Sequence, residues 1–299
     1  MDYCLSKHIN IVLSALSSRL SETIGRICEG SCVEEIRLRT GRSPQIVFAN
    51  GDAILTEHIF TETDAEELLE KLCRHAVYAH EDEIRNGFIT VDGGIRIGVC
   101  GRAVSEKDEL RRFSRISSFN IRIPREAVGC AEDVLDYLTD HGRPVSALIV
   151  APPCGGKTTL LRDSARCFSN GIRSSAVKVC IADERGELAG CIDGRPSYDI
   201  GARTDVLDLA PKASAIRLFV RTMSPDLIIT DEIGGADDAG AIAEAARCGV
   251  SIIASAHASS AIELKSRESL RTIMNEGVFK RVLLLRRNGS KLHIVPIKL

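Results

Sequence analysis

The feature that most constrains the fold is a glycine-rich segment, Ala151-Pro-Pro-Cys-Gly-Gly-Lys-Thr-Thr159, which begins at the last residue of the apolar run ALIVA. Phosphate-binding loops commonly have the pattern Gly, four residues, Gly-Lys-Ser/Thr. Gly156, Lys157 and Thr158 match the end of this pattern, and Ala151 stands where the first glycine is usual. The alternative is a glycine-rich turn with an incidental lysine. The apolar residues on both sides favour a strand, a loop and a helix.

Each residue type in this loop suits phosphate binding. Main-chain N–H groups of consecutive glycines can approach phosphate oxygens, and a helix that begins beside them adds its positive end. We expect the Lys157 ammonium to reach the β- and γ-phosphates of ATP and the Thr158 hydroxyl to be a ligand of Mg²⁺. The candidate nucleotide-binding residues are Ala151, Pro152, Pro153, Cys154, Gly155, Gly156, Lys157, Thr158 and Thr159.

Short apolar runs alternate with helical segments from residue 126 to residue 299. Continuous apolar runs are typical of strands buried on both faces, and the alternation of strand and helix predicts a parallel sheet. Asn288-Gly289 between the last two extended segments is a hairpin signal. The sequence therefore predicts an α/β domain with a mostly parallel sheet over 126–299. The apolar runs are ALIVA, VKVCIAD, DLIITD, SIIASA and FKRVLLL.

Residues 1–125 have a different pattern, which predicts a small α+β domain and a linker. Apolar residues recur at helical spacing over 9–24, and extended segments broken by Gly or Pro occupy 34–55. Thr63 and Glu66 form a candidate capping box for a second helix. Asp92-Gly93-Gly94 indicates a hairpin turn. The basic, polar stretch 106–125 is predicted to be a linker or an interface segment.

Two groups of acidic residues follow predicted buried strands. Asp231, at the end of DLIITD, is placed to hold the Mg²⁺ shell, and Glu232 to orient or deprotonate water. Asp183, Glu184 and Glu187 follow the run VKVCIA. Ligands of open α/β sheets bind at the carboxyl ends of the strands, so both groups could face the phosphates. The alternatives are a surface turn for the first group and a solvated acidic loop for the second.

His257 ends a third run of this kind, SIIASAH. A histidine at the end of a buried strand can sense a γ-phosphate through a hydrogen bond. The alternative is a buried histidine whose hydrogen bonds are satisfied by the protein.

The composition limits the classes of partner and compartment. Lys plus Arg is 39 and Asp plus Glu is 41, a formal net charge of −2, which gives no overall attraction to nucleic acid or to an anionic membrane. Eleven scattered cysteines without a C-x-x-C pair favour a reducing compartment. The N-terminus lacks a signal-peptide pattern, and the uncharged stretches fall short of a membrane span. We expect a cytoplasmic protein that could dock on a membrane through a partner.

Cys154 lies inside the phosphate loop, three residues before Lys157. A helix N-terminus and a nearby lysine favour thiolate over thiol. Cys154 should therefore react with alkylating reagents faster than most other cysteines of the chain, and ATP should protect it. The alternative is a thiol that packs against the sheet and reacts slowly with or without ligand.

Together these segments resemble the stage III sporulation protein AA family of endospore-forming bacteria, and beyond it the type II and type IV secretion and pilus-motor ATPases. The most specific stretch is SPDLIITDEIGGADDAGAIAEAARCGVSIIASAHASSAIEL, and ADERGELAG and EEIRLRTGRSP add to it. The resemblance implies a RecA-like P-loop ATPase domain that works as a ring, with a hexamer expected. It also implies a mother-cell role with membrane proteins of a channel complex that spans toward the forespore.

The resemblance assigns roles to individual residues. Glu232 matches the Walker B glutamate, His257 falls in the histidine box, and Glu184 and Glu187 fall in the acidic box that positions water or metal. The sequence departs from the pilus motors at Ala151 and at Asp231. Arginines that reach nucleotide in such motors have candidates here in Arg112, Arg115 and Arg122, which could equally solvate a linker, and in Arg217 and Arg221.

Two other functions remain open at this point. The first is a nucleic-acid-dependent P-loop ATPase, although none of the histidines has an arginine four residues before it, so the single-strand-binding module with an Arg-x-x-x-His core is absent. The near-neutral charge also disfavours nucleic acid as a partner. The second is a non-hydrolysing scaffold in which nucleotide only orders the ring.

Overall fold

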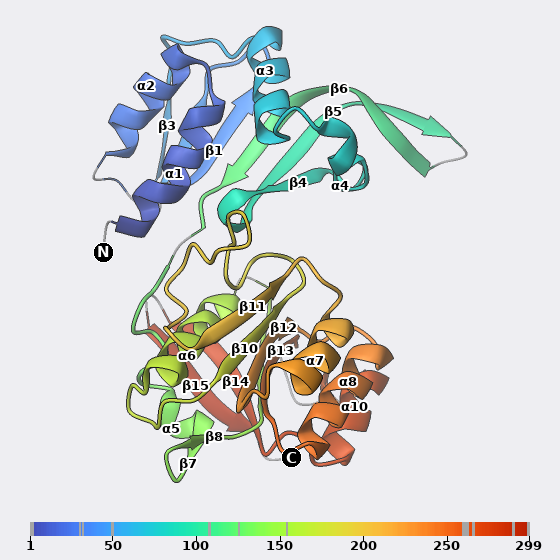
Figure 1. The fold of residues 1–299 in the computed structure, drawn as a ribbon. Coiled ribbons are helices and arrows are strands. Elements are labelled where there is room, and N and C mark those ends of the chain that lie inside the picture. The colour runs from blue at the N-terminus through green and yellow to red at the C-terminus, as the bar shows by residue number, and fades with distance from the viewer. Residues whose placement is uncertain are drawn as a thin grey trace. The chain divides into compact units, whose positions relative to one another are not determined.

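The computed structural model describes residues 3–29, 31, 33–48, 51–106, 109–124, 126–153, 155–258, 263–264, 267–288 and 291–297. Contacts between residues divide the chain into two compact units, Met1–Glu126 and Ala127–Leu299. Figure 1 shows the helices and strands of both units.

The first unit is an antiparallel sheet packed against helices. The strand order is β3-β2-β1-β6-β5-β4, with every described pair of neighbours antiparallel. Its strands are β1 (Val33–Arg39), β2 (Gln45–Phe48), β3 (Gly51–Ile54), β4 (Phe88–Val91), β5 (Ile95–Glu106) and β6 (Glu109–Arg122). Its helices are α1 (Tyr3–Ala15), α2 (Ser18–Cys28), α3 (Glu62–Leu72) and α4 (Glu81–Arg85), with short 3₁₀ turns η1 (Val77–His80) and η2 (Asp92–Gly94).

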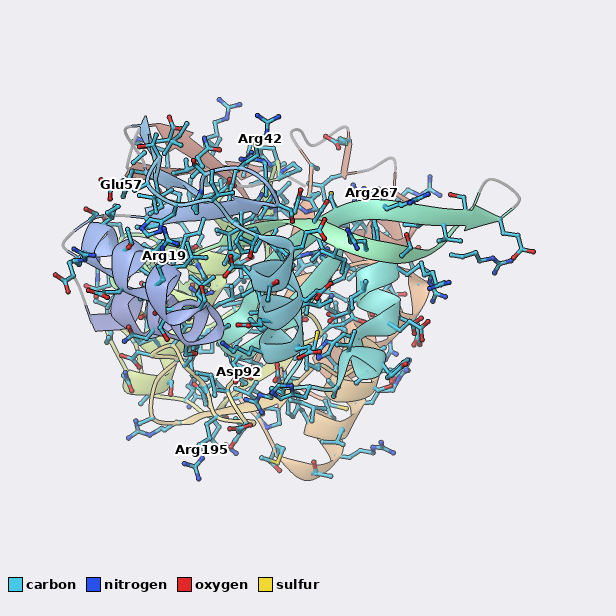
Figure 2. The ribbon with its side chains drawn as sticks, turned by 90° about the horizontal axis from the view of Figure 1, so that it is seen from above. Arg19, Arg42, Glu57, Asp92, Arg195 and Arg267 are labelled. Carbon is cyan, nitrogen blue, oxygen red and sulfur yellow. The ribbon has the colours of Figure 1, made fainter. Side chains whose placement is uncertain are left out.

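Alternation along the strands explains how the helices pack on the sheet. Ile36 and Leu38 of β1 are fully buried and join the same core as Leu20 and Ile24 of α2. Because successive strand side chains point to opposite faces, Arg37 between them and Arg39 after them lie on the other face. On the helical side, Arg19 of α2 donates a hydrogen bond of 3.2 Å to the main-chain carbonyl of Glu57, just after β3 (Figure 2).

Two expectations for this unit are wrong. Residues 109–122 form the long central strand β6 instead of a linker, because Phe119 and Ile121 alternate with polar residues and enter the core. The capping box of α3 is Thr61 with Asp64, two residues before the expected pair. Phe60, just before this cap, is fully buried, and an apolar residue there fixes the point at which the chain enters the helix. The hairpin at Asp92–Gly94 is confirmed by the pairing of β4 with β5.

The second unit is an α/β layer structure. Its main sheet has the order β11-β10-β12-β13-β9-β14-β15, with neighbouring strands parallel except the last pair, β14 and β15. The strands are β9 (Ala147–Ala151), β10 (Val179–Asp183), β11 (Thr204–Asp208), β12 (Leu227–Glu232), β13 (Ser251–His257), β14 (Arg281–Asn288) and β15 (Lys291–Ile297). A small pair, β7 (Thr139–Asp140) and β8 (Arg143–Pro144), follows α5 (Leu135–Leu138).

Helices cover both faces of this sheet. Helix α6 (Lys157–Asn170) lies on one face, and α7 (Lys212–Thr222), α8 (Ala236–Arg247) and α10 (Glu268–Asn275) lie on the other (Figure 1). Strands covered on both faces have no solvent-facing side, which explains their unbroken apolar runs. The predicted fold class, an α/β domain with a mostly parallel sheet after a small α+β domain, is confirmed.

The strand order gathers the sequence signals at one edge. Parallel strands all end at the same side of a sheet. Asp183 pairs in register with Asp208 of β11, and His257 pairs with Ala151 of β9. The ends of β10, β12, β13 and β9 are therefore consecutive along the edge where α6 begins.

Candidate nucleotide site

The glycine-rich loop joins β9 to α6 through a tight turn. Gly155 donates its N–H to the Pro152 carbonyl at 3.1 Å. A Cβ on Gly155 would lie 2.7 Å from the Ala151 Cβ and 2.9 Å from the Pro152 oxygen, so the turn has no room for a side chain. Gly156 caps α6 with φ of +88°, a left-handed conformation that favours glycine. Cys154 lies outside the described residues, so the expectation for its reactivity stays a prediction.

Lys157, the first residue of α6, folds back along this loop. It is 7% exposed, and its Nζ donates to the carbonyl oxygens of Ala151 and Pro152, both at 3.0 Å. The same Nζ lies 2.7 Å from Nδ1 of His257. Because an ammonium group can only donate, Nδ1 must accept. The remaining proton of a neutral His257 ring is then on Nε2.

His257 connects the loop to the acid at the end of β12. Its Nε2 lies 3.1 Å from Oε2 of Glu232, so the ring donates to this carboxylate. Arg185, in the turn after β10, places Nη1 at 3.6 Å from the same oxygen. The polar chain therefore runs from Lys157 through His257 to Glu232. It brings together three residues that the sequence placed far apart.

Asp231 and Glu184 meet at a residue that sequence reasoning missed. Lys212, the first residue of α7, is 2% exposed, and its Nζ lies 3.0 Å from Asp231 Oδ1 and 3.6 Å from Glu184 Oε2. It also donates to the main-chain carbonyl of Glu232. The signal that could have found it is a lysine directly after Pro211 at the start of a helix, where cations are disfavoured.

Asp183 holds the acidic loop together from the inside. Its carboxylate accepts the N–H groups of Glu187 at 2.9 Å and Ala189 at 2.8 Å, and the residue has no exposed surface. Burial raises the pKa of Asp183 to about 6, and the neighbouring charges of Asp231 and Asp208 add to this shift. Asp183 is therefore an anchor for the loop that carries Glu184 and Glu187.

A second anchor comes from the phosphate-loop helix. Arg162 of α6 donates through Nε to the Leu188 carbonyl and through Nη2 to the Glu187 carbonyl, both at 2.7 Å. The guanidinium also stacks 3.6 Å over the ring of Tyr198. The main chain of Glu187 is thus held by its N–H to Asp183 of β10 and by its carbonyl to Arg162 of α6.

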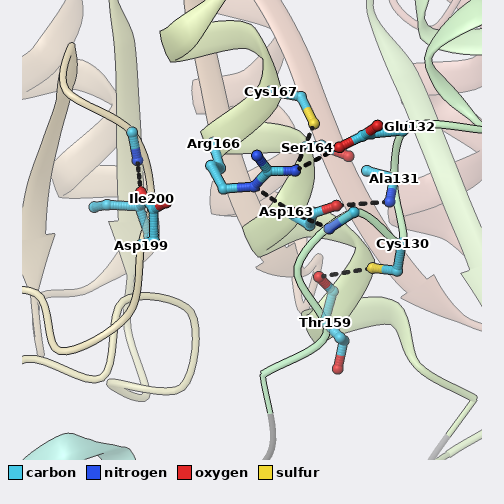
Figure 3. Close-up of polar contacts among 12 residues, drawn as sticks. Cys130, Ala131, Glu132, Thr159, Asp163, Ser164, Arg166, Cys167, Asp199 and Ile200 are labelled. Carbon is cyan, nitrogen blue, oxygen red and sulfur yellow. Dashed lines mark hydrogen bonds and ion pairs between the residues drawn. The ribbon is translucent and has the colours of Figure 1, made fainter. Parts of the chain in front are cut away.

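Helix α6 is itself tied to the segment that opens this unit (Figure 3). Asp163, 4% exposed, accepts the N–H groups of Gly129 at 3.1 Å and Ala131 at 2.7 Å. Arg166 donates to Asp163 at 2.6 Å and to Glu132 at 3.2 Å. These contacts fix the helix that begins at the loop.

Comparison with known proteins identifies the family. The family model described as "Sporulation stage III, protein AA" matches residues 6–298. The chain belongs to this family. Stage III sporulation protein AA of Bacillus subtilis (strain 168) is 39% identical over 282 residues, which cover 93% of this chain and 91% of that protein. Protein SEEDLING PLASTID DEVELOPMENT 1 of Arabidopsis thaliana is 29% identical over 227 residues, 75% of this chain and 30% of that protein.

Solved structures show the same fold. The pilus retraction motor PilT with bound ADP has a TM-score of 0.62 at 15% identity, over 91% of this chain and 80% of that one. The Legionella pneumophila ATPase DotB has a TM-score of 0.57 at 15% identity, over 88% of this chain and 76% of that one. This member of the sporulation family therefore has the RecA-like fold of secretion and pilus motors.

Most of the arginine candidates have acidic partners elsewhere in this family member. Arg217 on α7 pairs with Asp237 at 2.9 Å and Glu244 at 3.0 Å, and Arg221 donates to the carbonyl of Arg217 at 3.2 Å. In the first unit, Arg115 pairs with Glu62 at 2.7 Å and Arg122 lies 3.7 Å from Glu35, whereas Arg112 is exposed on β6. Arg185 contacts Glu232 and was not among the predicted arginines.

No helix in the described residues combines the length and the apolar character that crossing a bilayer requires.

Proposed function

We propose that this chain is a Mg²⁺-dependent ATPase that works as a ring, a hexamer, and powers or gates a membrane-spanning channel complex during endospore formation. Its place is the mother-cell cytoplasm, at the membrane through protein partners of that complex. The observation that carries the ATPase is the chain of contacts from Lys157 through His257 to Glu232 at the carboxyl edge of the sheet. Membership of the sporulation family supports the biological setting.

The loop residues are proposed to hold the phosphates. Gly156 caps α6, where the main-chain N–H groups of the first helical turn lie at the positive helix end and can bind a phosphate. The N–H of Gly155 is donated to Pro152 and shapes the turn. The Ala151 and Pro152 carbonyls and Nδ1 of His257 compete with a phosphate for the Lys157 ammonium. Binding of a triphosphate therefore exchanges neutral acceptors for charged oxygens, which make stronger hydrogen bonds with an ammonium group.

The donor set fits Mg²⁺. Thr158 in the first turn of α6 and Asp231 at the end of β12 supply oxygen atoms, which Mg²⁺ prefers. Asp231 Oδ1 is buried and accepts no hydrogen bond from the described residues, although the Lys212 ammonium lies nearby. We propose that Thr158 and Asp231 hold the metal shell. A bound Mg²⁺ would neutralise negative charge on the phosphates.

The acids are proposed to act on water. Glu232 accepts from His257 and lies beside Arg185, so its carboxylate is oriented from two sides. An oriented carboxylate at the phosphate edge can position a water molecule and take its proton. When a phosphate draws Lys157 away, Nδ1 of His257 becomes available, so His257 links phosphate binding to the orientation of Glu232. Glu184 and Glu187 are the rival candidates for the same task.

The test is ATP hydrolysis by the purified protein with and without Mg²⁺, measured together with its mass in solution. We expect turnover that requires Mg²⁺ and is lost in Lys157→Ala, and a mass that increases with ATP because nucleotide between subunits links binding to assembly. Unchanged hydrolysis in Lys157→Ala would falsify the motor. A chain that stays monomeric at high concentration with Mg²⁺ and ATP argues against a self-sufficient ring. Stimulation by single-stranded DNA or RNA favours the nucleic-acid-dependent class instead.

A further inference from the structure

A buried lysine lies between the two acidic groups of the candidate site. The Lys212 ammonium contacts the carboxylates of Asp231 and Glu184 and the main-chain carbonyl of Glu232. These partners come from the ends of β10 and β12, and Lys212 itself comes from the start of α7. One side chain therefore joins three elements at the edge where the phosphate loop also lies.

The position of Lys212 is unfavourable unless the acids compensate for it. The N-terminal end of a helix carries a partial positive charge, which disfavours a cation in the first turn. Removing an ammonium group from water adds a further cost unless it is paired. Both unfavourable effects act on Lys212, which lies in the first turn of α7 with 2% of its surface exposed. Its stability there depends on Asp231 and Glu184.

Negative charge at this edge extends beyond the partners of Lys212. Asp183 and Asp208 are adjacent in the parallel register of β10 and β11. Burial raises the pKa of Asp208, as it does that of Asp183. Carboxyl groups are therefore crowded at this edge, and the Lys212 ammonium is the cation that contacts two of them, those of Asp231 and Glu184.

We propose that Lys212 is a positioning residue of the nucleotide site, the internal cation that holds Asp231, Glu184 and the Glu232 main chain together and thereby sets how strongly a divalent metal binds. The inference rests on the proposed ATPase function. The ammonium and a metal ion are both attracted to Asp231. While Lys212 is paired with Asp231, the attraction between the Asp231 carboxylate and the metal ion is weakened. Without Lys212, Asp231 is available to the metal, and the end of β12 loses its connection to α7.

The inference gives opposite signs for metal binding and turnover. Lys212→Met keeps the length and apolar stem of the side chain and removes the charge. We expect it to bind Mn²⁺ on the order of 10-fold more tightly in the presence of ADP, because a nearby like charge is gone. We expect kcat for ATP hydrolysis to fall on the order of 10-fold or more, because the main-chain carbonyl of Glu232 loses its contact with Lys212 and the residue is positioned less well. Lys212→Arg keeps the charge and should restore the wild-type Mn²⁺ affinity.

The experiment titrates Mn²⁺ by electron paramagnetic resonance against wild type, Lys212→Met and Lys212→Arg, with ADP present. Lys178→Met is the matched control, since Lys178 is exposed just before β10, at the opposite edge of the sheet. Thermal unfolding of each variant reports whether it is folded. Mn²⁺ affinity that is unchanged or weaker in folded Lys212→Met overturns the inference.

A second variant covers the case in which Lys212→Met fails to fold because its acids are left unpaired. Lys212→Met combined with Asp231→Asn removes both charges of the pair, and we expect its Mn²⁺ affinity to return close to the wild-type value. A double variant that binds Mn²⁺ as tightly as we expect of Lys212→Met overturns the role of Asp231. ATP binding and hydrolysis by the wild-type protein are measured first. If the wild-type protein neither binds nor hydrolyses ATP, the proposed function itself is wrong.

Discussion

Lys157 in the phosphate loop and His257 at the end of β13 are in direct contact, with Nζ 2.7 Å from Nδ1. They are neighbours because β13 pairs in parallel with β9, so that His257 is opposite Ala151, where the loop begins. The contact fixes the tautomer of the ring and directs its other nitrogen to Glu232. Phosphate binding and the orientation of the candidate base therefore share one histidine.

The first prediction concerns His257→Ala. Loss of the ring removes one competitor for Lys157, so ADP affinity should stay within a few-fold of wild type or become tighter. Turnover should fall by roughly 100-fold, the scale of a general-base contribution, because Glu232 loses its partner. Fluorescent-ADP titration and steady-state ATP hydrolysis measure the two effects. Lost nucleotide binding with normal turnover per bound ATP contradicts the linkage.

The second prediction separates the acids. Glu232→Gln keeps the size of the side chain and removes the base, so it should bind ATP and lose turnover. Glu184→Gln and Glu187→Gln are the matched variants in the acidic loop, measured under the same conditions. If Glu232→Gln hydrolyses ATP normally and one of the two is inactive, the base belongs to that loop.

The third prediction uses the buried carboxyl of Asp183, whose pKa is raised from 3.8 to about 6 by burial. The folded chain then holds this proton more tightly than the unfolded chain between about pH 4 and pH 6. The free energy of unfolding should therefore fall as the pH rises through this window. The fall due to Asp183 is about 3 kcal/mol in total and is complete above pH 6.

Urea denaturation of wild type and Asp183→Asn at several pH values measures this loss. The variant also loses an acceptor for the Glu187 or Ala189 N–H, at every pH. The free-energy difference between wild type and variant should be larger at pH 4 than at pH 7. A difference that does not change with pH, or that grows toward pH 7, is the opposite result.

The fourth prediction concerns the ion pair that fixes α6. Asp163→Ala leaves the Arg166 guanidinium, whose side chain is 7% exposed, without its main partner. Breaking a buried pair from one side costs about 3–5 kcal/mol of unfolding free energy. Glu132→Ala removes the more exposed partner of the same arginine and should cost about 0–1 kcal/mol. Urea denaturation at neutral pH compares them, and equal losses contradict the assignment.

The sequence by itself determined the layers of this protein and the ends of its strands. Unbroken apolar runs indicate strands that are covered on both faces. Gly155 and Gly156 indicate a tight turn between a strand and a helix, because Gly155 has no room for a side chain and Gly156 has a positive φ. Local pattern failed where burial decided between alternatives. Thr61 caps α3 in place of Thr63, because Phe60 before it is buried in the core. Residues 109–122 form a strand, because Phe119 and Ile121 are buried in the same core.

Only the tertiary structure decided which polar groups meet. The order β10-β12-β13-β9 brings His257 between Lys157 and Glu232, and no local pattern encodes the order of strands in a sheet. The packing of α7 on the sheet brings Lys212 to Asp231, although their separation in the sequence gives no sign of it. Asp183 was grouped with Glu184 as a site acid, yet its carboxylate is used by the backbone of its own loop. Sequence periodicity reports which side chains are buried, whereas the partners of a buried charge depend on how distant elements pack.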